Sequence, residues 1–186
     1  MPIELRNFQD SDYDAFVELR NRVYPEYPGT AEEARRWDGM REPGHFFQRL
    51  VAVDSKSKKL VGVATLRHNL FSFNPKLLWL DLTVHSDFQH KGIGTKLYER
   101  CVQMARKAKV PRVRTTVSEN RASGLAFVKK FGFTEHHRVF ESKLDLRKFD
   151  FSKFEDPTPV LRAQGIELTT LGNEIAGLNS RKHFTE

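Results

Sequence analysis

The chain has 186 residues, of which 39% are hydrophobic and 30% charged, a balance typical of one globular domain with its own core. Its single cysteine excludes an intramolecular disulfide and a cysteine-based metal cluster, and no apolar run reaches the length of a membrane-spanning helix. The net charge of +7 favours an acidic ligand, but the basic residues are scattered along the sequence, which argues against a nucleic-acid-binding module.

The first residues carry no basic stretch followed by an apolar one, so no secretory signal is expected and a cytoplasmic location is favoured. Apolar alternation, capping residues and turn residues then predict a strand, two helices and a hairpin. The expected elements are a strand at 2–8, a helix from Ser11 or Asp12 to about Val23, a second helix from Thr30 to about Met40, and strands at about 46–53 and 60–68.

The centre of the chain predicts a strand, a glycine-containing loop and a helix. An apolar, β-prone run at 76–84 leads into the loop, in which Gly92 and Gly94 stand one residue apart. The helix that follows runs to about Lys107, because apolar residues recur at helical spacing. These residues are Leu97, Cys101, Met104, Ala105 and Ala108.

This arrangement points to an anion. The first N–H groups of a helix have no intrahelical partner, the helix dipole is positive there, and glycine lets the backbone approach a bound group. Lys91 and Lys96 add positive charge nearby. The spacing fits neither the dinucleotide fingerprint G-x-G-x-x-G nor a P-loop. An ordinary turn between strand and helix is the alternative interpretation.

The second half predicts a strand at about 112–118, a helix from Asn120 that ends at Gly132, and a long strand from Phe133 to Leu146. Residues 147–164 are rich in charge, proline and phenylalanine and are expected to be a linker. A strand at about 165–171 and a short helix capped by Asn173 follow. Strands and helices that alternate in this way predict an α/β domain, of the α+β layered kind.

The pattern Gln89-x-x-Gly92-x-Gly94, five residues after Val84, resembles the acetyl-CoA loop of the GNAT acetyltransferase superfamily. The resemblance spans about residues 3–146 and includes Asn120 and the pair Gly132-Phe133. It implies a GNAT-like mixed sheet, with antiparallel strands first and a parallel pair later, flanked by helices. It also implies acetyl-CoA as co-substrate. The residues that it assigns to acetyl-CoA binding are Leu82, Thr83, Val84, Gln89, His90, Lys91, Gly92, Ile93, Gly94, Thr95 and Asn120.

The same resemblance leaves the catalytic groups open. Many GNAT members have a tyrosine that protonates the departing thiolate, and Val128 stands at that position here. Asp81 and Glu119 are the candidates for the general base, with His85 as a third. Cys101 is rejected as a nucleophile because it lies on the apolar face of its helix.

The recurrence of Ile3-Glu4-Leu5 as Ile166-Glu167-Leu168 resembles tandem GNAT proteins of the mycothiol synthase type. We therefore expect a GNAT domain at 1–146, a linker at 147–164, and the start of a second GNAT domain at 165–186. Apolar surface left by an unfinished second domain would favour a homodimer.

The favoured function is acetyl-CoA-dependent N-acetyl transfer to an amine, without metal and without a membrane partner. The alternative is a degenerate GNAT domain that binds acetyl-CoA or CoA in a structural or regulatory role. The resemblance places residues 24–45 over the acceptor site. Its aromatic and acidic residues are either part of an acceptor pocket or part of the core and the solvated surface; they are Tyr24, Glu26, Tyr27, Trp37 and Asp38.

Overall fold

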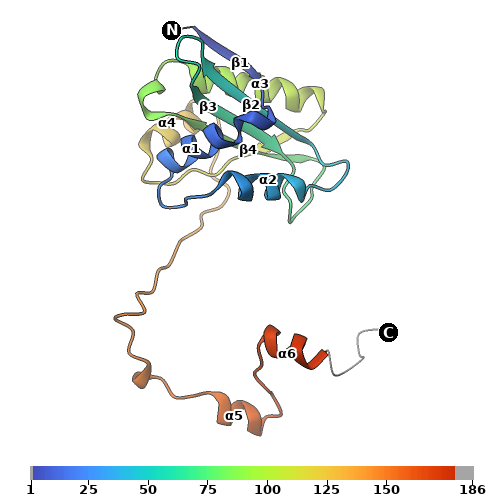
Figure 1. Ribbon diagram of the computed structural model, residues 1–186, viewed down its shortest axis with the longest axis vertical. Coiled ribbons are helices and arrows are strands. Elements are labelled where there is room, and N and C mark those ends of the chain that lie inside the picture. The colour runs from blue at the N-terminus through green and yellow to red at the C-terminus, as the bar shows by residue number, and fades with distance from the viewer. Residues whose placement is uncertain (1, 179–186) are drawn as a thin grey trace. The chain divides into compact units, whose positions relative to one another are not determined.

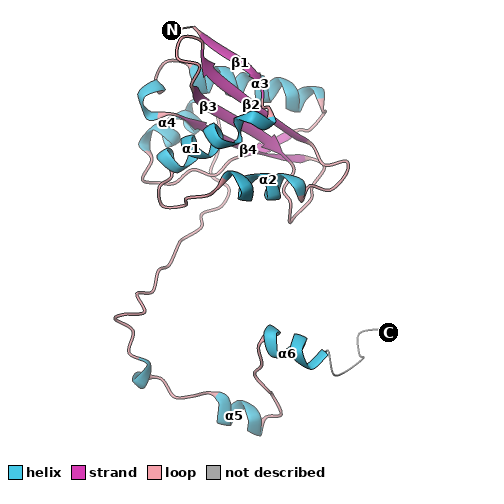
Figure 2. Cartoon of the chain, in the orientation of Figure 1, coloured by secondary structure: helices cyan, strands magenta, loops and turns pink. Residues whose placement is uncertain are grey.

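The computed structural model describes residues 2–178, which form two units that divide after Phe133. In the first unit, the described strands form one sheet in the order β1-β2-β3-β4-β5, and helices cover both of its faces (Figures 1 and 2). All neighbouring strands are antiparallel except β4 and β5, which are parallel. This mixed sheet flanked by helices confirms the predicted fold class. The strands are β1 (Ile3–Asn7), β2 (Phe47–Asp54), β3 (Leu60–Arg67), β4 (Leu77–Val84) and β5 (Arg112–Arg114).

The sheet separates two apolar clusters because neighbouring residues of a strand point to opposite faces. On β2, Val51 and Val53 pack with α1, whereas Leu50 and Ala52 belong to the cluster that contains α3. The α3 cluster includes Leu97, which is fully buried. The helices of this unit are η1 (Asp10–Asp12), α1 (Tyr13–Val23), α2 (Ala31–Gly39), η2 (Ser86–Phe88), α3 (Ile93–Lys107) and α4 (Ala122–Lys130).

The second helix begins as its sequence predicts. Thr30 Oγ1 accepts a hydrogen bond from the Glu33 N–H at 3.1 Å, and Glu33 Oε2 accepts one from the Thr30 N–H at 2.8 Å. This reciprocal pair is a capping box, which satisfies two backbone donors at the end of the helix.

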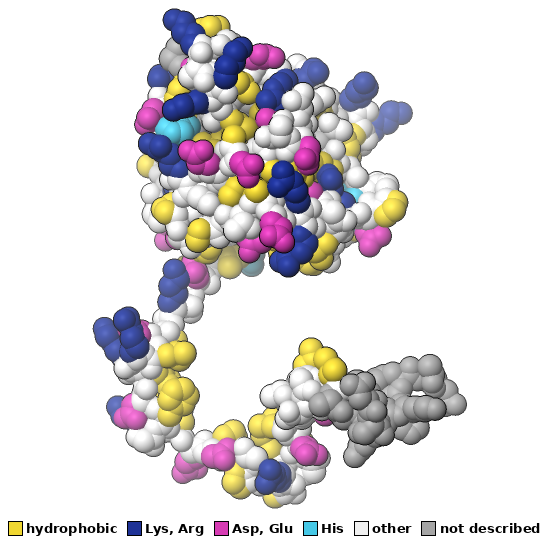
Figure 3. Space-filling model, in the orientation of Figure 1, with side chains coloured by type: hydrophobic (Ala, Val, Ile, Leu, Met, Phe, Trp, Pro, Cys, Tyr) yellow, Lys and Arg dark blue, Asp and Glu magenta, His cyan; other side chains and the backbone are white. Residues whose placement is uncertain are grey.

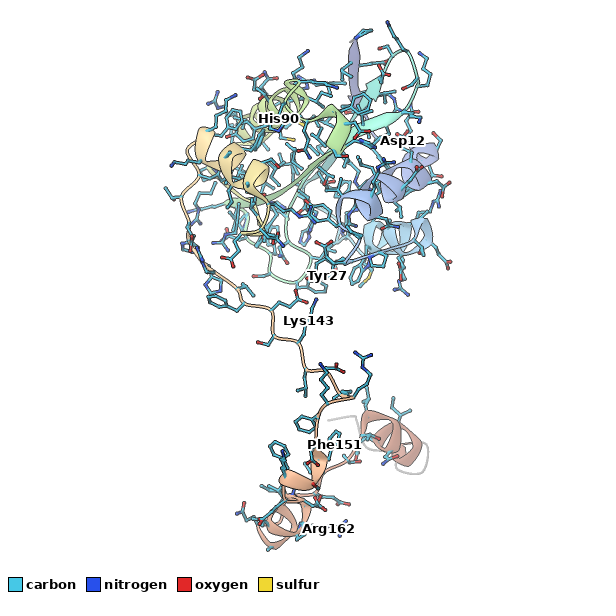
Figure 4. All side chains as sticks on the ribbon, turned by 90° about the vertical axis from the view of Figure 1, so that its left-hand side faces the viewer. Asp12, Tyr27, His90, Lys143, Phe151 and Arg162 are labelled. Atoms are coloured by element: carbon cyan, nitrogen blue, oxygen red, sulfur yellow. The ribbon has the colours of Figure 1, made fainter. Side chains whose placement is uncertain are left out.

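The first helix begins differently. Asp12 precedes α1, but its side chain does not cap that helix. Its carboxylate accepts hydrogen bonds from Arg6 Nη1 and Nη2 at 2.7 and 2.8 Å and from the Gln9 N–H at 2.8 Å. Asp12 therefore joins the start of α1 to β1 and lies at the place labelled in Figure 4.

Two predicted strands are wrong. Residues 134–146 form no regular structure, and Val139, Phe140 and Leu144 are 82%, 79% and 64% exposed. The described residues offer this segment no strand partner, and alternation of apolar residues alone cannot satisfy the backbone groups of an isolated strand. Residues 166–170 are likewise irregular.

The second unit, from Thr134, contains short helices: η3 (Phe151–Lys153), α5 (Thr158–Ala163) and α6 (Leu171–Leu178). The side chain of Thr170, rather than that of Asn173, accepts the hydrogen bond that caps α6. The ring of Phe149 stacks on that of Phe154 with centroids 5.0 Å apart, so the aromatic residues of the expected linker pack on one another. The domain boundaries at 146 and 164 stay predictions, and residues 179–186 of the expected tail lie outside the described residues.

The replacement Asp12→Asn tests the ion pair at the start of α1. The hydrogen bonds from Arg6 lower the pKa of the Asp12 carboxyl, so they stabilise the folded chain above the pKa of the unfolded carboxyl, about 4. We expect the variant to lose about 2 kcal/mol of unfolding free energy at pH 7. The loss should shrink as the pH falls below about 4, because the unfolded carboxyl then becomes protonated, and it should vanish once the pH falls through the lowered pKa of the folded carboxyl.

Urea unfolding at pH 7 and pH 3 measures this difference. The exposed neighbour Asp10, whose side chain is 85% accessible, supplies the control Asp10→Asn. An equal loss of stability at both pH values would contradict the assignment.

Candidate functional site

The parallel strands β4 and β5 are paired over only part of their length. Leu77–Trp79 pair with Arg112–Arg114, and β5 ends there. The rest of β4 continues to Val84 with β3 as its partner. Among the described residues, the other edge of Leu82–Val84 has no strand partner, so a gap opens between β4 and residues 115–118.

The helix α3 begins beside this gap. Gly92 precedes its first residue with φ +78°, a left-handed conformation that favours glycine, and His90 has φ +58°. No described side chain caps the helix, and its hydrogen-bonding pattern begins with Lys96 N–H to the Gly92 carbonyl at 3.0 Å. The N–H groups of the first turn therefore remain without intrahelical partners. Figure 4 shows His90 next to this end of α3.

Side chains fix the loop before α3. Gln89 Nε2 donates to the carbonyl of Val84 at 3.1 Å and so ties the loop to the end of β4. Lys91 Nζ donates to the Asp87 carbonyl at 2.6 Å. A Cβ added to Gly92 would meet nothing within 4 Å, so the space over this residue is open. An exposed lysine and a set of free helix N–H groups make the loop suited to an anion.

The second glycine has a different task. A Cβ on Gly94 would lie 3.1 Å from Cε2 of Phe127, a contact tighter than most. Gly94 therefore allows α4 to approach the first turn of α3. Tyr98, one turn later, contacts Phe127 and Phe131, with ring centroids 6.0 and 4.1 Å away.

Asp81 lies on the face of β4 that points toward α1 and α2. It pairs in register with Thr65, which in turn pairs with Arg49, so the three residues share one face. Asp81 Oδ2 lies 3.3 Å from Arg67 Nη2, and 57% of the Asp81 side chain is exposed. The predicted base candidate is therefore an accessible carboxylate with an arginine neighbour.

The other base candidate lies on the far side of the gap. Glu119 is an exposed residue of the turn before α4 and makes at least one contact there. Asn120 is exposed as well, and its Oδ1 accepts a hydrogen bond from Ser118 Oγ at 2.8 Å. The helix begins at Ala122, two residues after the predicted start at Asn120, and Val128 lies half-buried within it.

Among the predicted acceptor residues, Asp38 has a structural role. Its carboxylate accepts hydrogen bonds from Arg49 Nη1 and Nη2 at 2.7 and 3.0 Å and from the Tyr13 hydroxyl at 2.7 Å. Burial and the hydrogen bond to Asp38 raise the pKa of Tyr13. The guanidinium of Arg49 also lies 4.5 Å from the Phe16 ring centroid. This charge is paired and packed in the core, as buried charges usually are.

Tyr27 and Trp37 line a hollow of about 280 Å³ between α1 and α2. Their side chains are 56% and 44% exposed. Residues 24–26 make a contact that the sequence did not predict: Arg121, just before α4, forms an ion pair with Glu26 at 2.7 Å and lies over the ring of Tyr24. Because 95 residues separate Arg121 from Glu26, no local sequence pattern signals this contact.

No group of three or more His, Cys, Asp or Glu side chains in residues 2–178 could hold a metal ion. In the same range, no helix is long and apolar enough to cross a membrane. Figure 3 shows Lys and Arg side chains interspersed with Asp and Glu over the visible face of the first unit.

The model of the acetyltransferase (GNAT) family matches residues 13–133, which contain the gap, the loop and both flanking helices. The chain belongs to the GNAT acetyltransferase family. The match ends at Phe133, which is also the last residue of the first compact unit. A search among curated proteins found no matching sequence.

Solved structures support the same fold. An acetyltransferase of Trypanosoma brucei aligns with a TM-score of 0.59 and 24% identity, over 77% of this chain and 100% of the other. Glucosamine-6-phosphate N-acetyltransferase of Arabidopsis thaliana aligns with a TM-score of 0.59 and 20% identity, over 78% and 100%. The aminoglycoside N-acetyltransferase AAC(6')-Iy, in complex with a CoA-containing bisubstrate analog, has a TM-score of 0.59 and 15% identity, over 78% and 99%.

The reactivity of Cys101 provides a test of the core below the site. The residue is 2% exposed, and burial raises the pKa of its thiol to about 12. We expect a disulfide reagent at pH 8 to label the folded chain at least about a hundredfold more slowly than the urea-unfolded chain, because the thiolate is the reactive form. Absorbance of the released reagent measures both rates. Equal rates would contradict the burial of α3 against the sheet.

Proposed function

We propose that the GNAT domain of this chain is an acetyl-CoA-dependent N-acetyltransferase. The observation that carries the proposal is the unpaired edge of β4 beyond its pairing with β5, next to an uncapped helix N-terminus. The extended pantetheine arm of acetyl-CoA can pair with an unpaired strand edge. Its pyrophosphate can bind N–H donors in a region of positive potential. This chain offers both within one continuous segment, from Leu82 to Thr95.

The fit to CoA rests on the residues of that segment. Gln89, His90, Lys91, Gly92, Ile93, Gly94 and Thr95 would hold the pyrophosphate, mainly through backbone N–H groups, and the open space over Gly92 leaves room for it. The free edge of Leu82, Thr83 and Val84 would pair with the pantetheine arm and donate an N–H group to the thioester oxygen. Asn120 completes the set from the other side of the gap.

When bound, acetyl-CoA supplies an activated acetyl group to an attacking amine. The chain must remove a proton from the amine, and Asp81 and Glu119 are the proposed bases. Asp81 lies on the face of β4 that points toward α1, and Glu119 lies in the turn before α4. Val128 cannot donate a proton to the thiolate, so water or another side chain must do so.

The acceptor is proposed to be a primary amine. The structural neighbours include enzymes named for aminoglycosides and for glucosamine 6-phosphate. A panel of kanamycin, glucosamine 6-phosphate and a lysine-containing peptide covers these classes and a protein amine. Release of CoA with each amine, measured against the background without amine, tests the activity itself.

The replacement Gly92→Glu tests the cofactor loop. A carboxylate would enter the anion site, and a residue with a Cβ at φ +78° adds strain of about 1–2 kcal/mol. We expect the affinity for acetyl-CoA, measured by calorimetric titration, to fall at least about tenfold, which corresponds to about 1.4 kcal/mol.

Gly44 supplies a matched control, because it also has positive φ, at +86°, and open space around its Cα. The variant Gly44→Glu should therefore bind acetyl-CoA like the wild type. If Gly92→Glu and the wild type bind acetyl-CoA with equal affinity, the loop does not bind the cofactor. If the wild type does not bind acetyl-CoA, the proposal is overturned.

The replacement Val128→Tyr tests the missing acid. If protonation of the thiolate limits the rate, a phenol at this position should raise kcat by about 10²-fold or more, the usual range for general acid catalysis. Val128→Phe places the same ring without the hydroxyl and is the control. A similar kcat for the two variants would show that a proton donor at this position contributes nothing.

A further inference from the structure

The segment between α1 and α2, residues 24–30, is held at both ends by α1. The Tyr24 N–H donates to the Arg20 carbonyl at 2.7 Å. Asn21 clamps Gly29 with two hydrogen bonds of 2.9 Å, one to its carbonyl and one from its N–H. These contacts fix where the segment leaves α1 and where it enters α2. In the middle of the segment, around Glu26, the Tyr27 N–H donates to the Tyr24 carbonyl at 3.1 Å.

Arg121 fixes that middle from the other side of the domain. Its Nη2 lies 2.7 Å from Glu26 Oε1, and its guanidinium carbon lies 4.5 Å from the centroid of the Tyr24 ring. The two charged side chains are 32% and 39% exposed, so water screens this pair less than a fully exposed one.

The geometry of the pair also has a cost. Arg121 Nε is buried and donates to no described residue. Burial of a donor without a partner is unfavourable, so the ion pair and the contact with Tyr24 must offset that penalty to keep the guanidinium in place. In the position described, Arg121 faces both Tyr24 and Glu26.

This contact bridges the two sides of the gap. The helix α1 packs over β3 and β4, whereas Arg121 follows β5 and begins α4. Residues 24–26 therefore reach from the β4 side to the β5 side, on the face of the sheet that carries α1. This is the face to which Asp81 points.

We propose that Arg121 is a positioning residue that holds residues 24–26 across the acceptor side of the gap. The role rests on the proposed acetyltransferase activity. It adds to that proposal by assigning alignment of the acceptor to a contact between two residues that are 95 positions apart in the sequence. Arg121 need not touch either substrate. It acts through Glu26 and Tyr24, which border the acceptor's path.

The first experiment measures how firmly Arg121 holds residues 24–30, and it requires no catalytic activity. Hydrogen exchange of the amides of Glu26, Tyr27 and Gly29 is compared between the wild type and Arg121→Met, which keeps the length of the side chain. We expect exchange to rise about tenfold or more, the effect of losing one charge-assisted hydrogen bond. The Tyr27 amide is the most informative, since it donates to the Tyr24 carbonyl at 3.1 Å.

Arg35 supplies the matched control. It also combines an ion pair with an aromatic contact, at 3.6 Å from Asp10 and 4.5 Å from the Tyr13 ring centroid, but it joins α2 to the start of α1 and does not cross the gap. Arg35→Met should leave exchange at residues 26–29 unchanged. Equal rates of amide exchange in the wild type and Arg121→Met would show that Arg121 does not hold this segment.

The second experiment measures positioning, with the best amine of the panel as acceptor. Arg121→Met should raise the KM for the amine about tenfold, whereas the dissociation constant of acetyl-CoA changes less than about twofold. The exchanged pair Arg121→Glu with Glu26→Arg should restore most of the acceptor KM, whereas each single change should not. A merely structural role would instead change the thermal midpoint and the acetyl-CoA dissociation constant together with the acceptor KM.

Three results overturn the positioning role. The first is an unchanged acceptor KM in Arg121→Met, and the second is a loss of acetyl-CoA affinity in that variant as large as the rise in acceptor KM. The third is an exchanged pair whose acceptor KM is not restored although its thermal midpoint matches that of the wild type. If the wild type transfers acetyl to no amine of the panel, the proposed function and the positioning role fail together. Hydrogen exchange still decides whether Arg121 anchors the segment.

Discussion

The structure depends on the point at which β4 loses its second partner. A strand inside a sheet has both edges paired, and β4 meets this condition only at Trp79, where its pairing with β5 and its pairing with β3 overlap. Beyond Trp79 the strand keeps β3 on one edge and leaves the other edge free. A free backbone edge in the middle of a domain can bind an extended ligand by adding a strand-like partner. The position of the gap therefore decides where chemistry can occur.

The helix that follows β4 places a second type of binding group beside the first. The chain turns within residues 85–92, so the N-terminus of α3 lies at the end of the strand whose edge is free. Gly92 makes the turn possible through its positive φ, and Gly94 lets α4 close against α3. The two glycines of one motif thus do separate physical work, one in backbone conformation and one in helix packing. On the opposite face of the sheet, Asp38 and Arg49 hold α2 in place.

Local patterns predicted much of this fold. The apolar runs of β2 and β3, the capping box at Thr30 and the glycine that ends α4 are all patterns of residues close in sequence, and each is present in the structure. The loop Gln89–Gly94 was recognisable for the same reason. The long strand from Phe133 was wrongly predicted because a strand also needs a partner, and sequence alternation does not say whether one exists.

The features that the sequence did not predict are contacts between segments that are distant from one another in the chain. Asp38 is hydrogen-bonded to Arg49 and Tyr13, a pair of contacts that its local sequence does not signal. The pair of Arg121 with Glu26 had no signal at all, because neither residue lies in a motif that refers to the other. In both cases the tertiary fold brings together side chains from different elements.

The central claim is that CoA binds along the free edge of β4 and at the N-terminus of α3. An NMR titration of the full chain with CoA tests it most directly, because every backbone N–H group reports on its own surroundings. The account predicts the largest amide shifts in Leu82–Val84 and Gln89–Thr95, with little change in the hairpin turn at Asp54–Lys59. Shifts that are absent from both of these segments, or that concentrate on another surface, would contradict it.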